Sequence, residues 1–337
     1  SSVVTRIWTG TSFEFSVRQE TANLAFDAYG NVILQTVGTY DTETATAGET
    51  PLEERTITHT YGDNVAAARG NATETTIEIR VYDGAGLVFI EIQDIQNSFN
   101  LRGQTIGQVI TRSVVLAESP LVTERVEVRT LTNLSIDSRG NVEEQRVQIR
   151  VDDGTGTLTL TRIQLVTNRS FDAQGNILDQ RVENYVPGTS GDIFVDAQEI
   201  RNLSFDARGN ILSQQIENWV EDSSGAAVQL DTQIITHSNI DPLGRVGTLD
   251  VTTYEADGVT FIERRVTENL TFDVRGNATT QVIRLYDTEG AAQAFQRQEL
   301  SNTFDVRGRV TASSVVTRIW TGTSFEFSVR QETANLA

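Results

Sequence analysis

The sequence predicts an all-β protein, an antiparallel meander of nine two-strand repeats of about 35 residues that spirals into a rolled sheet, hollow β-solenoid or tube. Three observations predict this fold. A short phrase anchored by glycine recurs nine times at spacings of 32 to 40 residues, and it has the form Asp-x-x-Gly in seven of them. The segments between these phrases are rich in Val, Ile and Thr at period two. Gly, Asp and the four prolines gather in the predicted turns, and no segment has a convincing helical pattern.

The recurring phrase is clearest at Phe205-Asp206-Ala207-Arg208-Gly209-Asn210. Its nine anchoring glycines are Gly30, Gly70, Gly103, Gly140, Gly175, Gly209, Gly244, Gly276 and Gly308. Aspartate stands three residues before seven of them, at Asp27, Asp137, Asp172, Asp206, Asp241, Asp273 and Asp305. The Asp side chain can accept from nearby backbone N–H groups, and Gly adopts positive φ without a Cβ clash. We therefore predict nine structural turns of type I closed by a bulge glycine, with no helix between them.

A second turn is expected within each repeat, for example at Tyr82–Gly86, Asp222–Gly225, Asp257-Gly258 and Tyr286–Gly290. The first repeat has a longer connection, from Asp41 to Pro51. Strands joined by turns at both ends form an antiparallel meander.

A long repeat encloses the short ones. Residues Ser1–Ala25 and Ser313–Ala337 are identical, with an offset of 312 residues. We expect residues 1–337 to form one continuous array without separate domains, cut from a longer chain in which residues 313–337 begin the next copy.

Two rows of side chains are predicted to run across the sheet. The seventh residue after each anchoring glycine is Val or Ile, as at Ile216 and Ile283, which indicates a buried row. The fifth residue is Gln in six repeats: Gln35, Gln108, Gln145, Gln180, Gln214 and Gln281. Seven residues before the anchoring glycine, five repeats carry asparagine: Asn23, Asn133, Asn168, Asn202 and Asn269. Pairing across the bulged turn puts these two positions opposite each other, so we predict an amide ladder that fixes register.

Composition limits the classes of function. A net charge of −19 argues against a nucleic-acid partner, and the absence of Cys excludes disulfides and thiolate sites. His59 and His237 fall in different repeats, and His237 occupies a ladder position, which favours a structural role. We expect no enzymatic activity, catalytic residue, metal site or cofactor, with Ca²⁺ bound by the acidic surface as the less favoured interpretation. Glycans are candidate partners, through Asn-x-Ser/Thr sequons or a row of Tyr and Trp side chains.

The phrase (Phe/Tyr)-Asp-x-x-Gly-(Asn/Arg) resembles the YD-repeat (Rhs) family. The residues that carry this resemblance run from Phe205 to Asn210, from Phe304 to Arg309 and from Tyr286 to Gly290. The resemblance implies a long antiparallel sheet that spirals into a hollow β-shell, as in bacterial polymorphic toxins and wall-associated or adhesive surface proteins. This sequence departs from the family because Asn usually replaces Arg after the glycine, and because its period is longer.

These features together favour an extracellular or cell-surface structural protein, a fibre, filament or sheath whose partners are neighbouring copies of the same repeat. The alternatives are an Rhs-type β-shell that encapsulates a toxin or other cargo, and a surface adhesin or carbohydrate-binding module. No run of about 18 apolar residues occurs, so no helical membrane span is expected.

Overall fold

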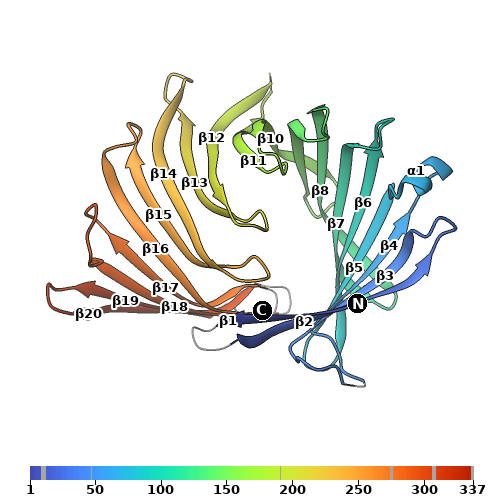
Figure 1. Cartoon of the computed structure of the whole chain (residues 1–337), viewed down its shortest axis with the longest axis horizontal. Helices are drawn as coiled ribbons and strands as arrows, with labels where there is room; N and C mark the ends of the chain where they lie inside the picture. Colours follow the sequence, from blue (N-terminus) through green and yellow to red (C-terminus); the bar gives the residue numbers. More distant parts are fainter. Residues whose placement is uncertain (9–12, 47, 190, 274–275, 306–308, 335–337) are drawn as a thin grey trace. The chain divides into compact units, whose positions relative to one another are not determined.

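The computed structural model describes residues 1–8, 13–46, 48–189, 191–273, 276–305 and 309–334, and the side chains of these residues outside 5–17. The described residues form twenty β-strands and one short helix (Figure 1). The first ten strands and the helix are β1 (Ser2–Trp8), β2 (Phe13–Phe26), β3 (Val32–Tyr40), β4 (Glu53–Thr60), α1 (Asn64–Arg69), β5 (Glu74–Tyr82), β6 (Leu87–Phe99), β7 (Thr105–Glu118), β8 (Leu121–Ile136), β9 (Val142–Asp152) and β10 (Leu158–Phe171). The others are β11 (Ile177–Pro187), β12 (Asp192–Phe205), β13 (Ile211–Glu221), β14 (Ala227–Ile240), β15 (Val246–Glu255), β16 (Phe261–Phe272), β17 (Ala278–Tyr286), β18 (Gln296–Phe304), β19 (Val310–Trp320) and β20 (Phe325–Ala334).

Consecutive strands pair in antiparallel fashion, from β2 to β10 and again from β12 to β20. The predicted all-β antiparallel meander is confirmed. Among the described residues, no helix is long and apolar enough to span a bilayer.

The chain divides into two compact units. One comprises residues 1–5, 15–169 and 181–195, and the other comprises residues 6–14, 170–180 and 196–337. Within each unit the hairpins follow one another in chain order, so a strand is hydrogen-bonded to the strands that precede and follow it in sequence.

The turn predicted at Gly70 is preceded by a short helix. Asp63 caps α1, because its Oδ1 accepts from the backbone N–H groups of Val65 and Ala66 at 2.9 and 2.7 Å. Gly70 ends this helix in the left-handed region, at φ 71°. The expectation of no helix was therefore wrong here. A side-chain cap at the start and a glycine at the end suffice for one short helix between β4 and β5 (Figure 1).

The predicted Val/Ile row is only partly buried. Ile216 and Ile283 are buried, at 9% and 6% exposure, whereas the other seven members are half-buried. Buried apolar residues lie elsewhere on the strands as well, at Val81, Phe89 and Val115. The sheet therefore stabilises itself through hydrogen bonding and half-buried side chains more than through a deep core.

Paired bulges lie beside the anchoring turns in four repeats. In the hairpin of β12 and β13, Phe205 pairs with Ile211, Ser204 with Ser213 and Asn202 with Gln214. One residue is skipped on each strand, so the two register shifts cancel. The residue skipped on the outgoing strand is an exposed leucine in each of these hairpins: Leu24, Leu134, Leu203 and Leu270.

Candidate functional site

The anchoring turns are closed by hydrogen bonds from both backbone and side chain. In the Asp206 turn, the N–H of Gly209 donates to the carbonyl of Asp206 at 3.0 Å, and Gly209 has φ 84°. Asp206 Oδ1 accepts from the N–H groups of Arg208 and Asn210 at 2.8 and 2.9 Å, and Asp206 Oδ2 accepts from Asn210 Nδ2 at 2.8 Å. The side chain of the residue after the glycine therefore donates a hydrogen bond to Oδ2, the second oxygen of the carboxylate.

The same side-chain bond closes the other described Asp turns. Asn donates to Asp Oδ2 at 2.8 Å in the turns of Asp27, Asp137, Asp172 and Asp273. Arginine donates through Nε in the turns of Asp241 and Asp305, at 2.6 and 2.7 Å. The glycines Gly30, Gly103, Gly140, Gly175, Gly244 and Gly276 all have φ between 81° and 98°. Gly308 lies outside the described residues.

Neighbouring turns contact one another through the residue that follows each glycine. A Cβ built on Gly209 would lie 3.2 Å from Asn176 Oδ1, and one built on Gly244 would lie 3.6 Å from Asn210 Oδ1. Asn31 Nδ2 also donates to the carbonyl of Ala67, at 2.6 Å. In these repeats the side chain after one glycine thus packs against the next turn and helps to position it.

Beside these turns, Gln and Asn side chains at the positions predicted for the ladder form a series of hydrogen bonds, which we call the amide relay. Gln281 Nε2 donates to Asn269 Oδ1 at 2.6 Å, and Asn269 Nδ2 donates to the carbonyl of Val246 at 2.8 Å. The relay therefore links a glutamine, the asparagine opposite it and the backbone of the preceding repeat. Gln145 and Asn133 make the same two bonds, the second to the carbonyl of Thr105 at 2.7 Å.

The relay varies between repeats. Gln35 donates to Asn23 at 2.7 Å. Gln108 donates at 2.8 Å to Asn97, one residue beyond the predicted partner Gln96, because this hairpin has a single register shift in place of the compensating pair.

Two further asparagines donate to the preceding repeat. Asn168 Nδ2 reaches the carbonyl of Val142 at 2.8 Å, and Asn202 Nδ2 reaches that of Ile177 at 2.9 Å. Gln214 lies opposite Asn202 in register, yet among the described residues Asn202 Oδ1 is buried without a hydrogen-bond partner. Gln180 follows its turn on β11, at the position that Gln145 holds on β9.

His237 takes the place of asparagine in the relay. Its Nδ1 lies 2.9 Å from the carbonyl oxygen of Ile211, and since a carbonyl only accepts, the ring donates from Nδ1. His59 Nδ1 lies 2.9 Å from Thr75 Oγ1 on the neighbouring strand β5. Each histidine is thus engaged by an adjacent strand of the sheet.

The turn carboxylates couple the fold to pH. The side-chain hydrogen bond from Asn210 and the backbone hydrogen bonds around it lower the pKa of Asp206 below its ordinary value of 3.8. The bond from Asn176 likewise lowers the pKa of Asp172, against the opposing effect of burial. A carboxyl with a lowered pKa in the folded state contributes stability above its unfolded pKa and loses that stability as pH falls through the folded pKa.

We therefore expect the free energy of unfolding to be flat from about pH 7 to pH 5 and to fall below about pH 4. The Asp206→Asn variant keeps an acceptor oxygen, as Asn100 does when its Oδ1 accepts from the N–H groups of Arg102 and Gln104 at 2.9 and 3.0 Å. It should show a shallower acid limb in urea unfolding at graded pH. Parallel acid limbs for parent and variant would contradict this assignment.

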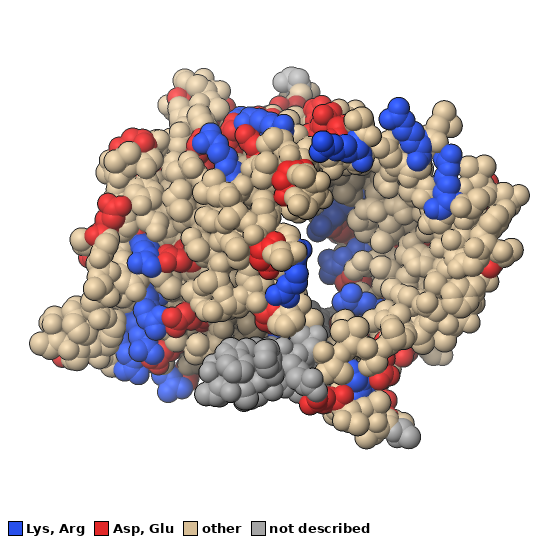
Figure 2. All heavy atoms as spheres, in the orientation of Figure 1, with Lys and Arg blue, Asp and Glu red and all other residues tan. Residues whose placement is uncertain are grey.

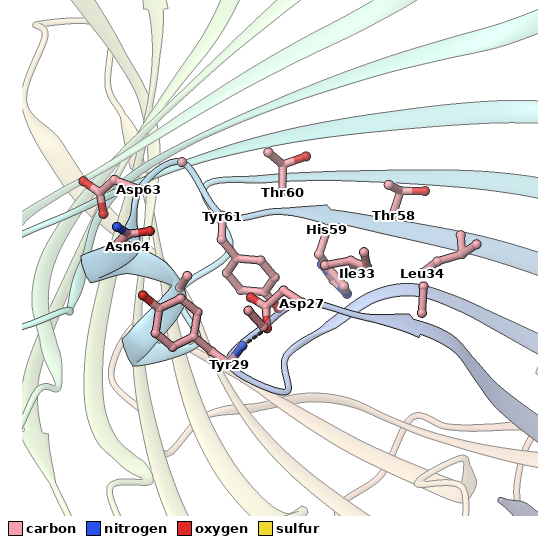
Figure 3. Close-up of a pocket in the computed structure, with 14 residues that line it drawn as sticks. Asp27, Tyr29, Ile33, Leu34, Thr58, His59, Thr60, Tyr61, Asp63 and Asn64 are labelled. Carbon is pink, nitrogen blue, oxygen red and sulfur yellow. Dashed lines mark hydrogen bonds between the residues drawn. The ribbon is translucent and has the colours of Figure 1, made fainter.

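An open hollow near the turns lies in the first unit, between the Asp27 turn and the end of β4 (Figure 3). It has a volume of about 720 Å³, and its lining includes Asp27, Tyr29, His59, Tyr61 and Asn64. Tyr29 is 53% exposed, and Tyr61 Oη donates to the carbonyl of Val32 at 3.2 Å. Burial, and secondarily the charge of Asp27, raises the pKa of Tyr61.

This hollow has two aromatic rings close to Asp27, while His59 lies toward Ile33 and Leu34 (Figure 3). Asp27 is engaged by its own turn through Tyr29 N–H and Asn31. The arrangement offers ring surfaces and polar groups to a ligand such as a sugar. Among the described residues, no group of three or more His, Asp or Glu side chains is placed to hold a metal ion.

A buried arginine site lies where β2, β3 and the following loop meet. Arg18 is 2% exposed. Its Nη1 donates to the carbonyl and the Oγ1 of Thr42 at 2.9 and 3.2 Å, and its guanidinium lies 4.4 Å from the centre of the Tyr40 ring. Nη2 forms an ion pair with Glu49, and Nε lies 3.1 Å from Glu20 Oε1. We call Tyr40, Thr42 and Glu49 the arginine socket.

Sequence reasoning missed this socket, because Thr42 and Glu49 belong to the irregular Asp41–Pro51 connection. The available signal was the repeated segment itself, which contains the same arginine as Arg18 and Arg330. Gly38 also contributes, since a Cβ there would lie 2.9 Å from the Tyr40 ring, so a side chain at this position would displace the ring from the socket.

Charged side chains elsewhere are interspersed. On the face shown in Figure 2, arginines lie beside acidic residues and do not gather in a patch of one sign. Cross-strand pairs such as Arg112 with Glu91 and Arg264 with Asp250 account for part of this pattern, at 2.9 and 2.5 Å. Exposed pairs of this kind contribute little to stability but help to fix strand partners.

No protein-family model matches the chain, and no curated protein matches it. Among solved structures, the chain is similar to a porin-like protein from Bacteroides uniformis, at 11% identity and a TM-score of 0.26, over 78% of this chain and 96% of that one. It is also similar to chains of TcdB2-TccC3-TEV and of the Photorhabdus luminescens Tc holotoxin pore, each at 10% identity and a TM-score of 0.12. These two matches cover 99% of this chain and 26% of the other, so the chain spans about a quarter of their length. At such TM-scores the likenesses show neither the family nor the function of this chain.

Proposed function

We propose that this chain is part of an extracellular structural protein, a fibre or sheath built from YD-like repeats whose long units join through their sheet edges. The observation that carries the proposal is the repeated hairpin. Ser1 and Thr21 exchange both backbone hydrogen bonds, at 2.8 and 2.7 Å, and the identical residues Ser313 and Thr333 are paired in the same register. One segment thus forms the same hairpin in two places, 312 residues apart.

The turns and the amide relay support a role in which mechanical force is transmitted from one repeat to the next. Four asparagines of the relay donate to a backbone carbonyl of the preceding repeat: Asn133, Asn168, Asn202 and Asn269. Several turns also contact the next through the side chain after their glycine, as Asn176 does with the Gly209 turn and Asn210 with the Gly244 turn. Coupling between nearest neighbours is what stabilises repeat arrays, and it extends without limit when units are added.

Electron microscopy of the native assembly, with the mass of the intact protein measured alongside, tests the proposal. The eighteen strands from β3 to β20 form one long repeat, which at about 4.8 Å per strand corresponds to roughly 86 Å along the hydrogen-bonding direction. We expect a continuous filament whose axial repeat accounts for 312 residues. Discrete capped particles with internal density would overturn the fibre and favour a cargo shell instead. Glycan binding at the Tyr29 hollow is the adhesin alternative.

A further inference from the structure

The hollow between the Asp27 turn and the end of β4 is a place where the chain departs from its own repeat. The residue before the anchoring glycine is arginine in six repeats, but in the first repeat it is Tyr29. Beside it, Tyr61 leads into α1, the one helix among the described residues. Departures from a local rule that gather at one place point to a function there.

The two tyrosines present ring surface to the hollow, and both rings lie close to Asp27 (Figure 3). Tyr29 is 53% exposed, and its position is set by the turn, because its N–H donates to Asp27 Oδ1 at 2.9 Å. Tyr61 Oη donates to the carbonyl of Val32 at 3.2 Å, which holds the second ring in the wall. Apolar side chains, including Ile33, line the same hollow. A ligand would therefore meet two rings and an apolar wall.

The charge of this hollow is negative. With His59 neutral, the charged side chains in its lining are the carboxylates of Asp27 and Asp63. Arg69, the last residue of α1, lies at the next turn instead, where its Cδ would be 3.6 Å from a Cβ built on Gly103. The field of the carboxylates favours a cationic ligand over a neutral or anionic one.

Elsewhere the chain covers aromatic rings with its own arginines. Four rings have a guanidinium 4.3 to 5.2 Å from their centres: Tyr40, Phe89, Phe272 and Tyr286. Within the described part of the chain, neither Tyr29 nor Tyr61 has such a partner. Because the face of an aromatic ring attracts a cation, these two rings can accept one from outside the chain.

The carboxylates of the hollow supply charge more than hydrogen-bonding capacity. Asp27 Oδ1 accepts from two backbone N–H groups of its turn at 2.9 and 2.8 Å, and its Oδ2 accepts from Asn31 Nδ2 at 2.8 Å. Asp63 Oδ1 likewise accepts from two backbone N–H groups of α1, at 2.9 and 2.7 Å. A cation rich in N–H donors, such as arginine or lysine, would find these acceptors engaged. A quaternary ammonium has no N–H group and needs none of them.

We propose that this hollow binds a quaternary ammonium group of the choline type. Its methyl groups pack against the rings of Tyr29 and Tyr61, and its charge lies in the field of Asp27 and Asp63. The volume of about 720 Å³ leaves space for whatever carries the ammonium group. The site is contained in the first unit and does not depend on whether the chain forms a fibre.

Calorimetric titration of the full chain with choline tests the site. The control ligand is neohexanol, the neutral isostere in which a carbon atom replaces the nitrogen of choline. We expect saturable binding of choline at one site per chain, at least about tenfold tighter than binding of neohexanol, because only choline gains the attraction of the rings and carboxylates.

Two variants that suit the local structure probe the rings and the charge. Tyr29→Arg introduces the residue that six repeats carry before the glycine, so it keeps the turn, places a cation in the hollow and should weaken choline binding at least about tenfold. Asp63→Asn keeps the acceptor that caps α1 but removes its charge, and should weaken binding about threefold. Asp137→Asn, at the equivalent turn three repeats along, is the matched control and should leave the affinity unchanged.

Cosedimentation with phosphatidylcholine vesicles distinguishes the source of the ammonium group. Binding to vesicles that Tyr29→Arg abolishes would identify a lipid headgroup, whereas binding of free choline alone would identify a soluble ligand. Equal affinities for choline and neohexanol, or unchanged choline binding by Tyr29→Arg, would overturn the inference. Binding of methyl glucoside without binding of choline would also overturn it and would favour a sugar site.

Discussion

Replacing Gly209 with valine is expected to lower the free energy of unfolding by about 2–3 kcal/mol, one of the two largest effects expected among the substitutions proposed for this chain. Gly209 has φ 84°, a conformation that a β-branched residue adopts only under strain. The new Cβ would also lie 3.2 Å from Asn176 Oδ1, where the neighbouring turn packs. Chemical denaturation followed by circular dichroism measures the loss.

Substitutions at two other glycines separate the cost of backbone strain from the cost of a clash with the neighbouring turn. Gly30 has φ 86°, and a Cβ at this position would have no neighbour within 4 Å, so Gly30→Val should show the conformational cost alone. Gly86 lies in a second turn, where a Cβ would again have no neighbour within 4 Å, and Gly86→Ala should change the free energy of unfolding by less than about 0.5 kcal/mol. Equal losses at Gly209 and Gly30 would show that contact between turns contributes nothing.

Replacing Asn269 with alanine is expected to lower the free energy of unfolding by about 1–3 kcal/mol, because two partners lose their hydrogen bonds together. Gln281 Nε2 loses its acceptor at 2.6 Å, and the carbonyl of Val246 loses its donor at 2.8 Å. Hydrogen exchange at the amides of β15 to β17 should accelerate more than exchange in distant strands, since the relay acts between adjacent repeats.

The control for the relay is His237→Asn, which introduces the residue that most repeats carry at this position. It should preserve the donor to Ile211 and leave the free energy of unfolding within about 0.5 kcal/mol of the parent. An Asn269→Ala variant as stable as His237→Asn would contradict an energetic role for the relay.

The fold class follows from the sequence because its signals are local and repeated. An aspartate that accepts from the backbone and a glycine at positive φ specify a turn without help from distant residues. The alternation of Val, Ile and Thr then specifies strands between turns. The opposition of Asn269 to Gln281 could also be predicted, since counting outward from a turn gives the register.

That counting succeeded in four hairpins because their two bulges cancel, which the sequence did not reveal. In the hairpin of β6 and β7 a single bulge moves the partner of Gln108 from Gln96 to Asn97. The capped helix α1 was likewise missed, because its six residues show too little periodicity to be distinguished from a turn.

The arginine socket was unpredictable for a different reason. Two of its residues, Thr42 and Glu49, belong to a long connection that the other repeats lack. They contact Arg18 only because that loop folds back toward β2. Loop conformation depends on contacts distant in sequence, which pattern and propensity do not encode.

The compensating bulges also constrain how such an array can evolve. A one-residue insertion in a single strand turns every side chain beyond it to the other face, so it separates the relay amides unless the opposite strand gains a residue too. Selection should therefore tolerate length changes in hairpin tips, or as matched insertions across a hairpin, and should remove solitary ones within strands. The exposed leucines Leu24, Leu134, Leu203 and Leu270 lie at four places where the two strands of a hairpin carry such matched extra residues.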